Sequence, residues 1–157
     1  MSTNQVLTKE EVTKAQELWG AGIVQIGTDF TADKNYTQTA IDHIDNLYAY
    51  DQSPVLFKPT KAAEEQFRGD KESALSYFVA TNGKCKEDKG FAIKPWTKVR
   101  FENTGMILED NRAIAMGNYF FTDLDGNEAK VEYTFGYKLS NGALKIDVHH
   151  SSFPYNP

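Results

Sequence analysis

Residues 113–152 read AIAMGNYFFTDLDGNEAKVEYTFGYKLSNGALKIDVHHSS. Apolar and polar side chains alternate along much of this stretch, and a period of two indicates strands with one buried face. Asp125-Gly126 and Asn141-Gly142 interrupt the alternation, and both dipeptides are typical of tight hairpin turns. The stretch therefore predicts an antiparallel meander of three strands, over residues 113–122, 128–137 and 144–151.

Upstream of this meander the apolar residues recur at spacings of three and four, which indicates amphipathic helices. Thr8 and Glu11 have the spacing of a capping box, which predicts that the first helix begins there. The expected elements before the meander are helices over 8–28, 40–48 and 70–79 and strands over 55–58, 91–102 and 105–108. Helices segregated from an antiparallel sheet define the α+β class.

Length and composition narrow the functional classes. The chain has 157 residues and a net charge of −5, which fits one domain and disfavours partners such as nucleic acid or an anionic membrane surface. No apolar run approaches the ~20 residues of a membrane span, and no signal peptide precedes the first helix. The single cysteine, Cys85, fits a reducing compartment. We expect a cytoplasmic protein with a disordered lead over residues 1–7 and a single domain over 8–157.

Aromatic residues are abundant, at 13% of the chain, with eight tyrosines and ten phenylalanines. Tyrosine has an apolar body and a hydroxyl that needs a partner when it is buried. A sheet rich in tyrosine could line an apolar pocket that carries hydroxyl groups, and its walls could include Tyr119, Tyr133 and Phe135. A densely packed β core explains the same composition, so both interpretations stay open.

A dedicated metal site is not expected. The three histidines are His43, His149 and His150, and neighbouring residues on a regular strand point to opposite faces. No spacing typical of a zinc site completes a ligand set. The sequence therefore predicts no metal ligands and no cofactor, and carboxylate-bound magnesium or manganese stays open as an alternative.

Polar side chains end the last strand, which is otherwise apolar on one face. Ile146 and Val148 share a face with His150 and Ser152 if the strand is regular. His150 and Ser152 are therefore predicted to point into the interior, and His149 to lie on the opposite face. A β-bulge near Val148 would exchange the two faces. Buried imidazole and hydroxyl groups need hydrogen-bond partners, and a structural pair explains them as well as an active site does.

Several longer segments carry a family resemblance. They are VLFKPTK at 55–61, FRG at 67–69, ALSYFV at 74–79, GFAI at 90–93, PWTKVRF at 95–101, AMGNYFFTD at 115–123, VEYTFGY at 131–137 and the HHSS-x-P ending at 149–154. In these segments the chain resembles the iota-class carbonic anhydrases, a branch of the cone-shaped superfamily named after nuclear transport factor 2. It is also similar to the association domain of calcium/calmodulin-dependent protein kinase II. The resemblance runs from about residue 19 to residue 155.

The resemblance implies a curved antiparallel sheet wrapped by about three helices into a cone, commonly paired as a homodimer. It also implies a carbon–oxygen lyase, a carbonic anhydrase that interconverts carbon dioxide and bicarbonate without a required metal. By motif position the catalytic residues are Thr60, Tyr77, His150 and Ser152. On the opposite face, the usual dimer surface of the superfamily, His149 would serve association or hydrogen-bond locally. Two alternatives remain open, because a fold alone does not define a function. One is a non-catalytic module for ligand binding or oligomerisation, and the other is an acid–base isomerase or dehydratase.

Overall fold

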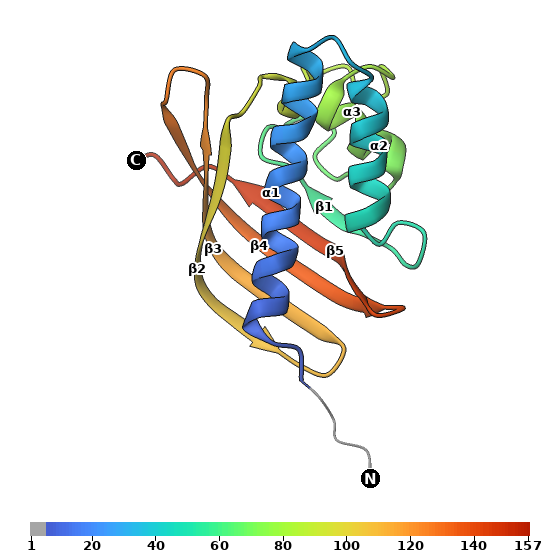
Figure 1. Cartoon of the computed structure of the whole chain (residues 1–157), viewed down its shortest axis with the longest axis vertical. Coiled ribbons are helices and arrows are strands. Elements are labelled where there is room, and N and C mark those ends of the chain that lie inside the picture. Colours follow the sequence, from blue (N-terminus) through green and yellow to red (C-terminus); the bar gives the residue numbers. More distant parts are fainter. Residues whose placement is uncertain (1–5) are drawn as a thin grey trace.

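The computed structural model describes residues 6–157, in which α1 crosses one face of a five-stranded sheet with α2 and α3 beside it (Figure 1). The elements in chain order are α1 (Lys9–Thr31), α2 (Tyr36–Leu47), β1 (Leu56–Lys58), α3 (Lys71–Val79), the 3-10 helix η1 (Phe91–Ile93), β2 (Lys98–Leu108), β3 (Arg112–Thr122), β4 (Glu128–Ser140) and β5 (Ala143–Ser152). The predicted α+β class is confirmed.

The strand order is β1-β5-β4-β3-β2, and the sheet is open, with β1 and β2 at its edges. The predicted meander from β3 to β5 is confirmed as antiparallel. The prediction of an entirely antiparallel sheet is wrong for β1, which pairs with β5 in parallel. This pairing places the segment that follows β1 beside the end of β5.

The predicted strand over 91–102 is wrong in its first half. Residues 91–93 form η1 instead, because Gly90 takes a left-handed conformation at φ +87° and Pro95 has no N–H to donate to a neighbouring strand. From Lys98 the strand continues without a break through residues 105–108, with a register irregularity between Asn103 and Gly105.

The predicted capping box of α1 is confirmed: the Glu11 backbone N–H donates to Thr8 Oγ1 at 3.1 Å, and the Thr8 N–H donates to Glu11 Oε1 at 3.0 Å. The helix does not end near Gly27 but continues to Thr31. A Cβ on Gly27 would lie 3.0 Å from the Ala92 carbonyl oxygen, so this glycine allows close packing against η1 and does not end the helix.

Residues 1–5 of the predicted disordered lead lie outside the described residues. Leu7, the last residue of that lead, is buried, and its backbone N–H donates to the Glu109 carbonyl at 2.9 Å. One core cluster of buried side chains joins the helices to the sheet. Within residues 6–157 no helix has the length and apolar character needed to cross a bilayer.

The stability of this core is expected to depend on pH through His43, which is buried between Trp19 and Phe78. Burial lowers the pKa of His43 to about 4, whereas the unfolded residue has a pKa of ~6.5. The unfolded chain therefore binds a proton first as the pH falls below ~6.5, and this disfavours folding. Between about pH 6.5 and pH 4 the free energy of unfolding should drop by roughly 3 kcal/mol through His43 alone.

Urea unfolding of the wild type and of His43→Leu across this pH range tests the expectation. The variant should lose less stability on acidification than the wild type does. Equal losses in the two proteins would assign the acid sensitivity to other groups.

Candidate active site

A register shift in β5 sets the orientation of the candidate site. Ile146 pairs with Tyr137 and Val148 pairs with Gly136, so that Asp147 is an extra residue on the β5 side. Such a bulge restarts the alternation of side chains one residue later. The residues after Val148 therefore face opposite sides from those that a regular strand would give them.

The predicted inward orientation of His150 and Ser152 is wrong. His149 and Ser151 are the buried residues, at 2% and 1% exposure, whereas His150 is exposed. Ser152 is directed to the outer face of the sheet, where its hydroxyl donates to Glu132 Oε1 at 2.9 Å. The catalytic roles that the resemblance implied for His150 and Ser152 therefore pass, as a proposal, to His149 and Ser151.

The imidazole of His149 lies between two buried phenols. Its Nδ1 is 2.8 Å from the Tyr48 hydroxyl, and its Nε2 is 3.1 Å from the Tyr119 hydroxyl. Trp19 Nε1 donates to the Tyr48 oxygen at 3.0 Å, which leaves the Tyr48 proton to be donated to Nδ1. This assignment satisfies every group when Nε2 carries the imidazole proton and donates to Tyr119.

The chain of hydrogen bonds continues from Tyr119 to the loop after β1. The Tyr119 hydroxyl donates to Ser151 Oγ at 2.5 Å, and Ser151 Oγ lies 2.5 Å from Thr60 Oγ1. Tyr77 on α3 accepts a hydrogen bond from the Lys61 backbone N–H at 3.3 Å. The structure thus brings the predicted site residues Thr60 and Tyr77 together with Ser151.

These groups are neutral near pH 7. Burial lowers the pKa of His149 well below its ordinary value, and the nearby His150 and His43 lower it further. Burial raises the pKa of Tyr48, Tyr77 and Tyr119 above that of a solvated phenol. The arrangement can therefore pass protons between neutral hydroxyl and imidazole groups, and it does not hold a fixed charge.

A small cavity of about 10 Å³ lies against this chain, close to the smallest space that holds one water molecule. Its lining combines hydroxyl and imidazole groups with aromatic rings. The lining residues are Trp19, Phe57, Pro59, Thr60, Tyr77, Phe78, Phe91, Tyr119, His149 and Ser151. Of the aromatic walls predicted from the sequence, Tyr119 lines this cavity and Phe135 stacks on the His149 ring with centroids 4.1 Å apart. Tyr133 instead donates to Asn103.

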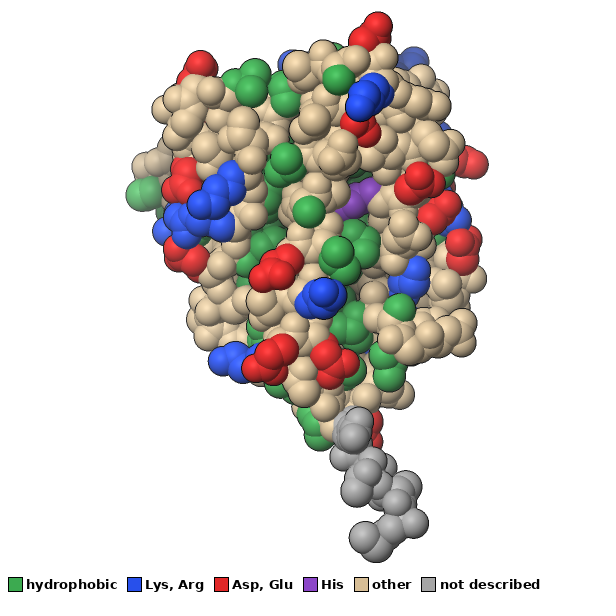
Figure 2. Space-filling model, in the orientation of Figure 1, with side chains coloured by type: hydrophobic (Ala, Val, Ile, Leu, Met, Phe, Trp, Pro, Cys, Tyr) green, Lys and Arg blue, Asp and Glu red, His purple; other side chains and the backbone are tan. Residues whose placement is uncertain are grey.

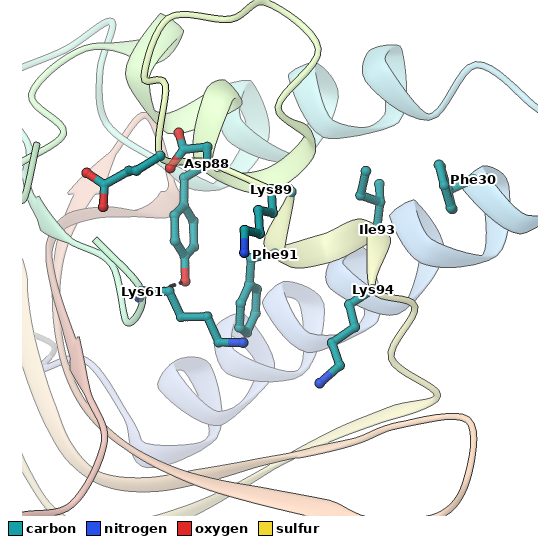
Figure 3. A pocket seen from close by; sticks show the side chains of 10 residues that line it. Phe30, Lys61, Asp88, Lys89, Phe91, Ile93 and Lys94 are labelled. Atoms are coloured by element: carbon teal, nitrogen blue, oxygen red, sulfur yellow. Dashed lines mark hydrogen bonds between the residues drawn. The ribbon is translucent and has the colours of Figure 1, made fainter. Parts of the chain in front are cut away.

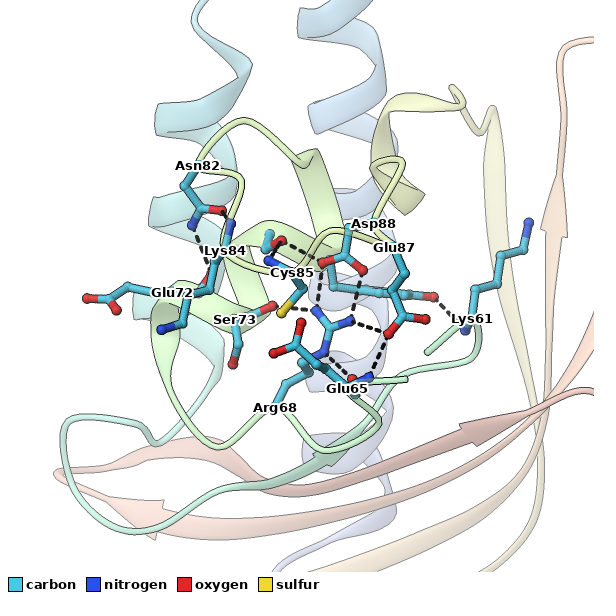
Figure 4. Close-up of polar contacts among 12 residues, drawn as sticks. Lys61, Glu65, Arg68, Glu72, Ser73, Asn82, Lys84, Cys85, Glu87 and Asp88 are labelled. Atoms are coloured by element: carbon cyan, nitrogen blue, oxygen red, sulfur yellow. Dashed lines mark hydrogen bonds and ion pairs between the residues drawn. The ribbon is translucent and has the colours of Figure 1, made fainter. Parts of the chain in front are cut away.

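A buried ion pair fixes the two loops around the cavity (Figure 4). Both terminal nitrogens of Arg68 donate to the Asp88 carboxylate, at 2.7 and 2.8 Å, and Ser76 Oγ donates to it at 2.6 Å. The Glu87 carboxylate accepts three backbone N–H groups from residues 63–65. The loop between β1 and α3 is thereby tied to the loop between α3 and η1.

Asp88→Asn is expected to destabilise the fold strongly. The side chains of Arg68 and Asp88 are 0% and 1% exposed, and breaking a buried pair while one charge remains costs about 3–5 kcal/mol. The matched control is Glu128→Gln, which breaks the bidentate pair with the half-exposed Arg100 and should cost less than about 1 kcal/mol. Urea unfolding of both variants measures the difference, and similar losses would contradict a structural role for the buried pair.

Across residues 6–157 no group of three or more His, Cys, Asp or Glu side chains is arranged to hold a metal ion. The family model described as metal-independent carbonic anhydrase matches residues 10–153. The chain belongs to this family. This membership confirms the resemblance found in the sequence. It also confirms the predicted enzyme class, carbonic anhydrase.

Individual relatives agree with this assignment. A metal-independent carbonic anhydrase of Nostoc sp. (strain PCC 7120 / SAG 25.82 / UTEX 2576) is 40% identical over 156 residues, which cover 97% of this chain and 76% of that protein. The crystal structure of an iota-carbonic anhydrase from a cyanobacterium, complexed with bicarbonate, aligns with a TM-score of 0.94 and 37% identity over 100% of this chain and 98% of that one.

A more distant structure shares the fold alone. It is a putative calcium/calmodulin-dependent protein kinase II association domain from Xanthomonas campestris, with a TM-score of 0.67 and 23% identity over 96% of this chain and 91% of that one.

Two members of the site were not predicted as partners of a histidine. Tyr48 and Trp19 have no local sequence signal for this role, because it depends on their contacts with His149 on β5.

Proposed function

We propose that this chain catalyses the reversible hydration of carbon dioxide to bicarbonate without a metal cofactor, in the cavity beside Thr60. One observation carries the proposal: a continuous chain of hydrogen bonds runs from His149 through Tyr119 and Ser151 to Thr60 and ends at a cavity with an aromatic wall. Membership of the metal-independent carbonic anhydrase family, whose structural relative was crystallised with bicarbonate, supports it.

In the proposed hydration step a water molecule held by Thr60 and Ser151 attacks the carbon of carbon dioxide. The new carbon–oxygen bond forms as one C=O π bond breaks, and the negative charge collects on the carbon dioxide oxygens. Hydroxyl donors from Thr60 and Tyr77 stabilise this charge, as oxyanion donors do in acyl transfer. The aromatic wall holds the apolar gas and excludes bulk water.

The proton released by the water passes along the hydroxyl groups to Tyr119, whose own proton moves to His149 Nε2. This direction requires the tautomer in which Nε2 is free and Nδ1–H points to Tyr48. The Tyr48 hydroxyl proton then loses its acceptor, at a cost of about 1–3 kcal/mol. Because the buried imidazolium is disfavoured, His149 holds the proton only until bicarbonate has left. The proton then returns along the same chain to a water molecule that has entered the cavity and leaves with it to bulk solvent, and the dehydration of bicarbonate uses the steps in reverse.

Stopped-flow measurement of carbon dioxide hydration by chelator-treated protein tests the proposal. Activity should be unchanged after exhaustive chelation and should not rise when Zn²⁺, Mg²⁺ or Mn²⁺ is added back. Activity that disappears with chelation and returns with one ion would contradict metal independence. A folded protein with no activity under any condition would favour the alternative of a non-catalytic binding or oligomerisation module.

We further propose a homodimer formed through the outer face of the sheet. A groove of about 390 Å³ on this face is lined in part by His150 and by Met116, which is 56% exposed, and exposed apolar side chains often mark association surfaces. Met116→Glu should shift sedimentation equilibrium toward the monomer. An unchanged assembly, or a monomeric wild type, would contradict this surface.

The remaining proposals concern partners and location. Carbon dioxide and bicarbonate are the proposed small-molecule partners, and nucleic acid is not, because acidic and basic side chains are interspersed on the face shown in Figure 2 and the net charge is −5. We place the protein in the cytoplasm, since Cys85 is a buried free thiol that fits a reducing compartment. We also propose that residues 8–157 form a single domain.

A further inference from the structure

A second and larger hollow lies outside the candidate site (Figure 3). Its volume is about 690 Å³, and it shares Tyr77 and Phe91 with the small inner cavity. The two rings are stacked, with centroids 5.5 Å apart and an interplanar angle of 16°. One layer of aromatic rings therefore separates the inner cavity from this outer hollow.

Three lysines give the outer hollow a positive charge. Lys61, Lys89 and Lys94 line it, and among the described residues none of their ammonium groups has a carboxylate within 4.0 Å. In Figure 3 the side chains of Lys61 and Lys89 extend toward Phe91. Burial and the repulsion of the other two ammonium groups lower the pKa of Lys61, as expected for cations gathered without counter-ions.

The two carboxylates of the hollow do not neutralise these lysines. Asp88 is bound by Arg68 and by the Ser76 hydroxyl, and Glu87 is held by three backbone N–H groups. The oxygens of both carboxylates are therefore occupied by donors from the protein itself, and neither carboxylate pairs with a lysine of the hollow. An anion in the hollow would be attracted by three lysines, of which Lys94 holds its ammonium over the Trp96 ring at 4.9 Å from the centroid, and would meet no free carboxylate.

As it stands in this structure, the inner cavity of about 10 Å³ has room for about one water molecule, so the rings that line it must move aside for it to hold carbon dioxide or bicarbonate during the proposed reaction. Of these rings, Phe91 is only half-buried and lines both spaces, so its displacement would join the inner cavity to the outer hollow. Gly90 precedes Phe91 at φ +87°, a conformation that glycine adopts without strain. The hollow outside the rings is thus the first space that a departing anion reaches on this side.

From these observations we infer that Lys61, Lys89 and Lys94 form an antechamber for bicarbonate, which holds the anion outside the Tyr77–Phe91 ring layer before entry and after release. The inference rests on the proposed function and adds a second binding position and its charge selectivity. Neutral carbon dioxide gains nothing from these charges, whereas a small oxyanion does.

The test compares two triple variants with the same change in net charge. Lys61→Gln/Lys89→Gln/Lys94→Gln removes the antechamber cations, and Lys9→Gln/Lys14→Gln/Lys130→Gln removes three exposed lysines outside the lining of the hollow. The measured quantity is the inhibition constant of added bicarbonate in stopped-flow carbon dioxide hydration. This inhibition constant is more informative than the ratio of kcat/KM for hydration to kcat/KM for dehydration, because the reaction equilibrium fixes that ratio for every variant.

We expect the inhibition constant to rise about tenfold in the antechamber variant, from three weak contributions of the size of exposed ion pairs. The control variant should stay within about twofold of the wild type, and added salt should weaken bicarbonate inhibition of the wild type more than that of the antechamber variant. Equal shifts in both variants, or none in either, would overturn the antechamber while leaving the proposed activity intact. A wild type without hydration activity would overturn the proposed function itself.

Discussion

His149→Gln is expected to reduce carbon dioxide hydration by about 10²-fold or more, the range lost when general acid–base help is removed. Glutamine can accept from Tyr48 and donate toward Tyr119 through one planar amide, so the buried position keeps hydrogen-bonding groups. It cannot gain and release a proton near neutral pH. The loss should therefore appear in kcat, with little change in the unfolding free energy.

The matched control is His150→Gln, because His150 is the neighbouring residue and lies on the outer face of the sheet. Its hydration rate should stay close to that of the wild type. Loss of activity in His150→Gln together with an active His149→Gln would mean that β5 has the regular register and that the bulge at Asp147 does not form in solution. Circular dichroism and urea unfolding of both variants exclude a trivial loss of fold.

Local sequence signals predicted much of the fold. Asn141 and Gly142 have φ values of 51° and 81°, as the two central residues of the predicted hairpin turn require. Asp70 caps α3, since its carboxylate accepts the Ser73 N–H at 2.8 Å. These features depend on residues a few positions apart, which is why the sequence alone reveals them.

The bulge in β5 depends on a more distant contact, and no local pattern shows it. Asp147 is the extra residue, and its carboxylate accepts two hydrogen bonds from Arg112 on β3, at 2.6 and 3.2 Å. Counting alternate residues from Ile146 therefore gives the correct face as far as Asp147 and the wrong face beyond it. The orientation of the two histidines was mispredicted for this reason.

The residues of the candidate site that belong to a sequence motif were predictable. The contacts that tertiary packing creates between distant segments were not. Thr60 and Tyr77 were assigned from segments that resemble a family, and the structure places both at the cavity. The parallel pairing of β1 with β5 aligns Lys58 with His150 and so brings Thr60 beside Ser151. That long-range pairing has no signature in a strand of three residues.

Tyr119→Phe is expected to lower the hydration rate by about 10²-fold, as removal of a positioned proton-transfer group does. Among residues 6–157, the Tyr119 hydroxyl is the one group that hydrogen-bonds to both His149 Nε2, at 3.1 Å, and Ser151 Oγ, at 2.5 Å. Its removal separates the imidazole from the hydroxyl groups at the cavity while both remain in place. The aromatic ring, which stacks on Trp19 at 5.6 Å between centroids, is retained.

The matched control is Tyr137→Phe, because the Tyr137 hydroxyl is equally buried but has no hydrogen-bond partner among the described residues. Its removal should leave activity unchanged and should not lower stability, since no hydrogen bond is lost. If Tyr119 and His149 act in one relay, the double variant Tyr119→Phe/His149→Gln should be no slower than the slower single variant, because groups that act as a unit are not additive. Losses that multiply in the double variant, or an active Tyr119→Phe, would show that protons reach His149 by another route.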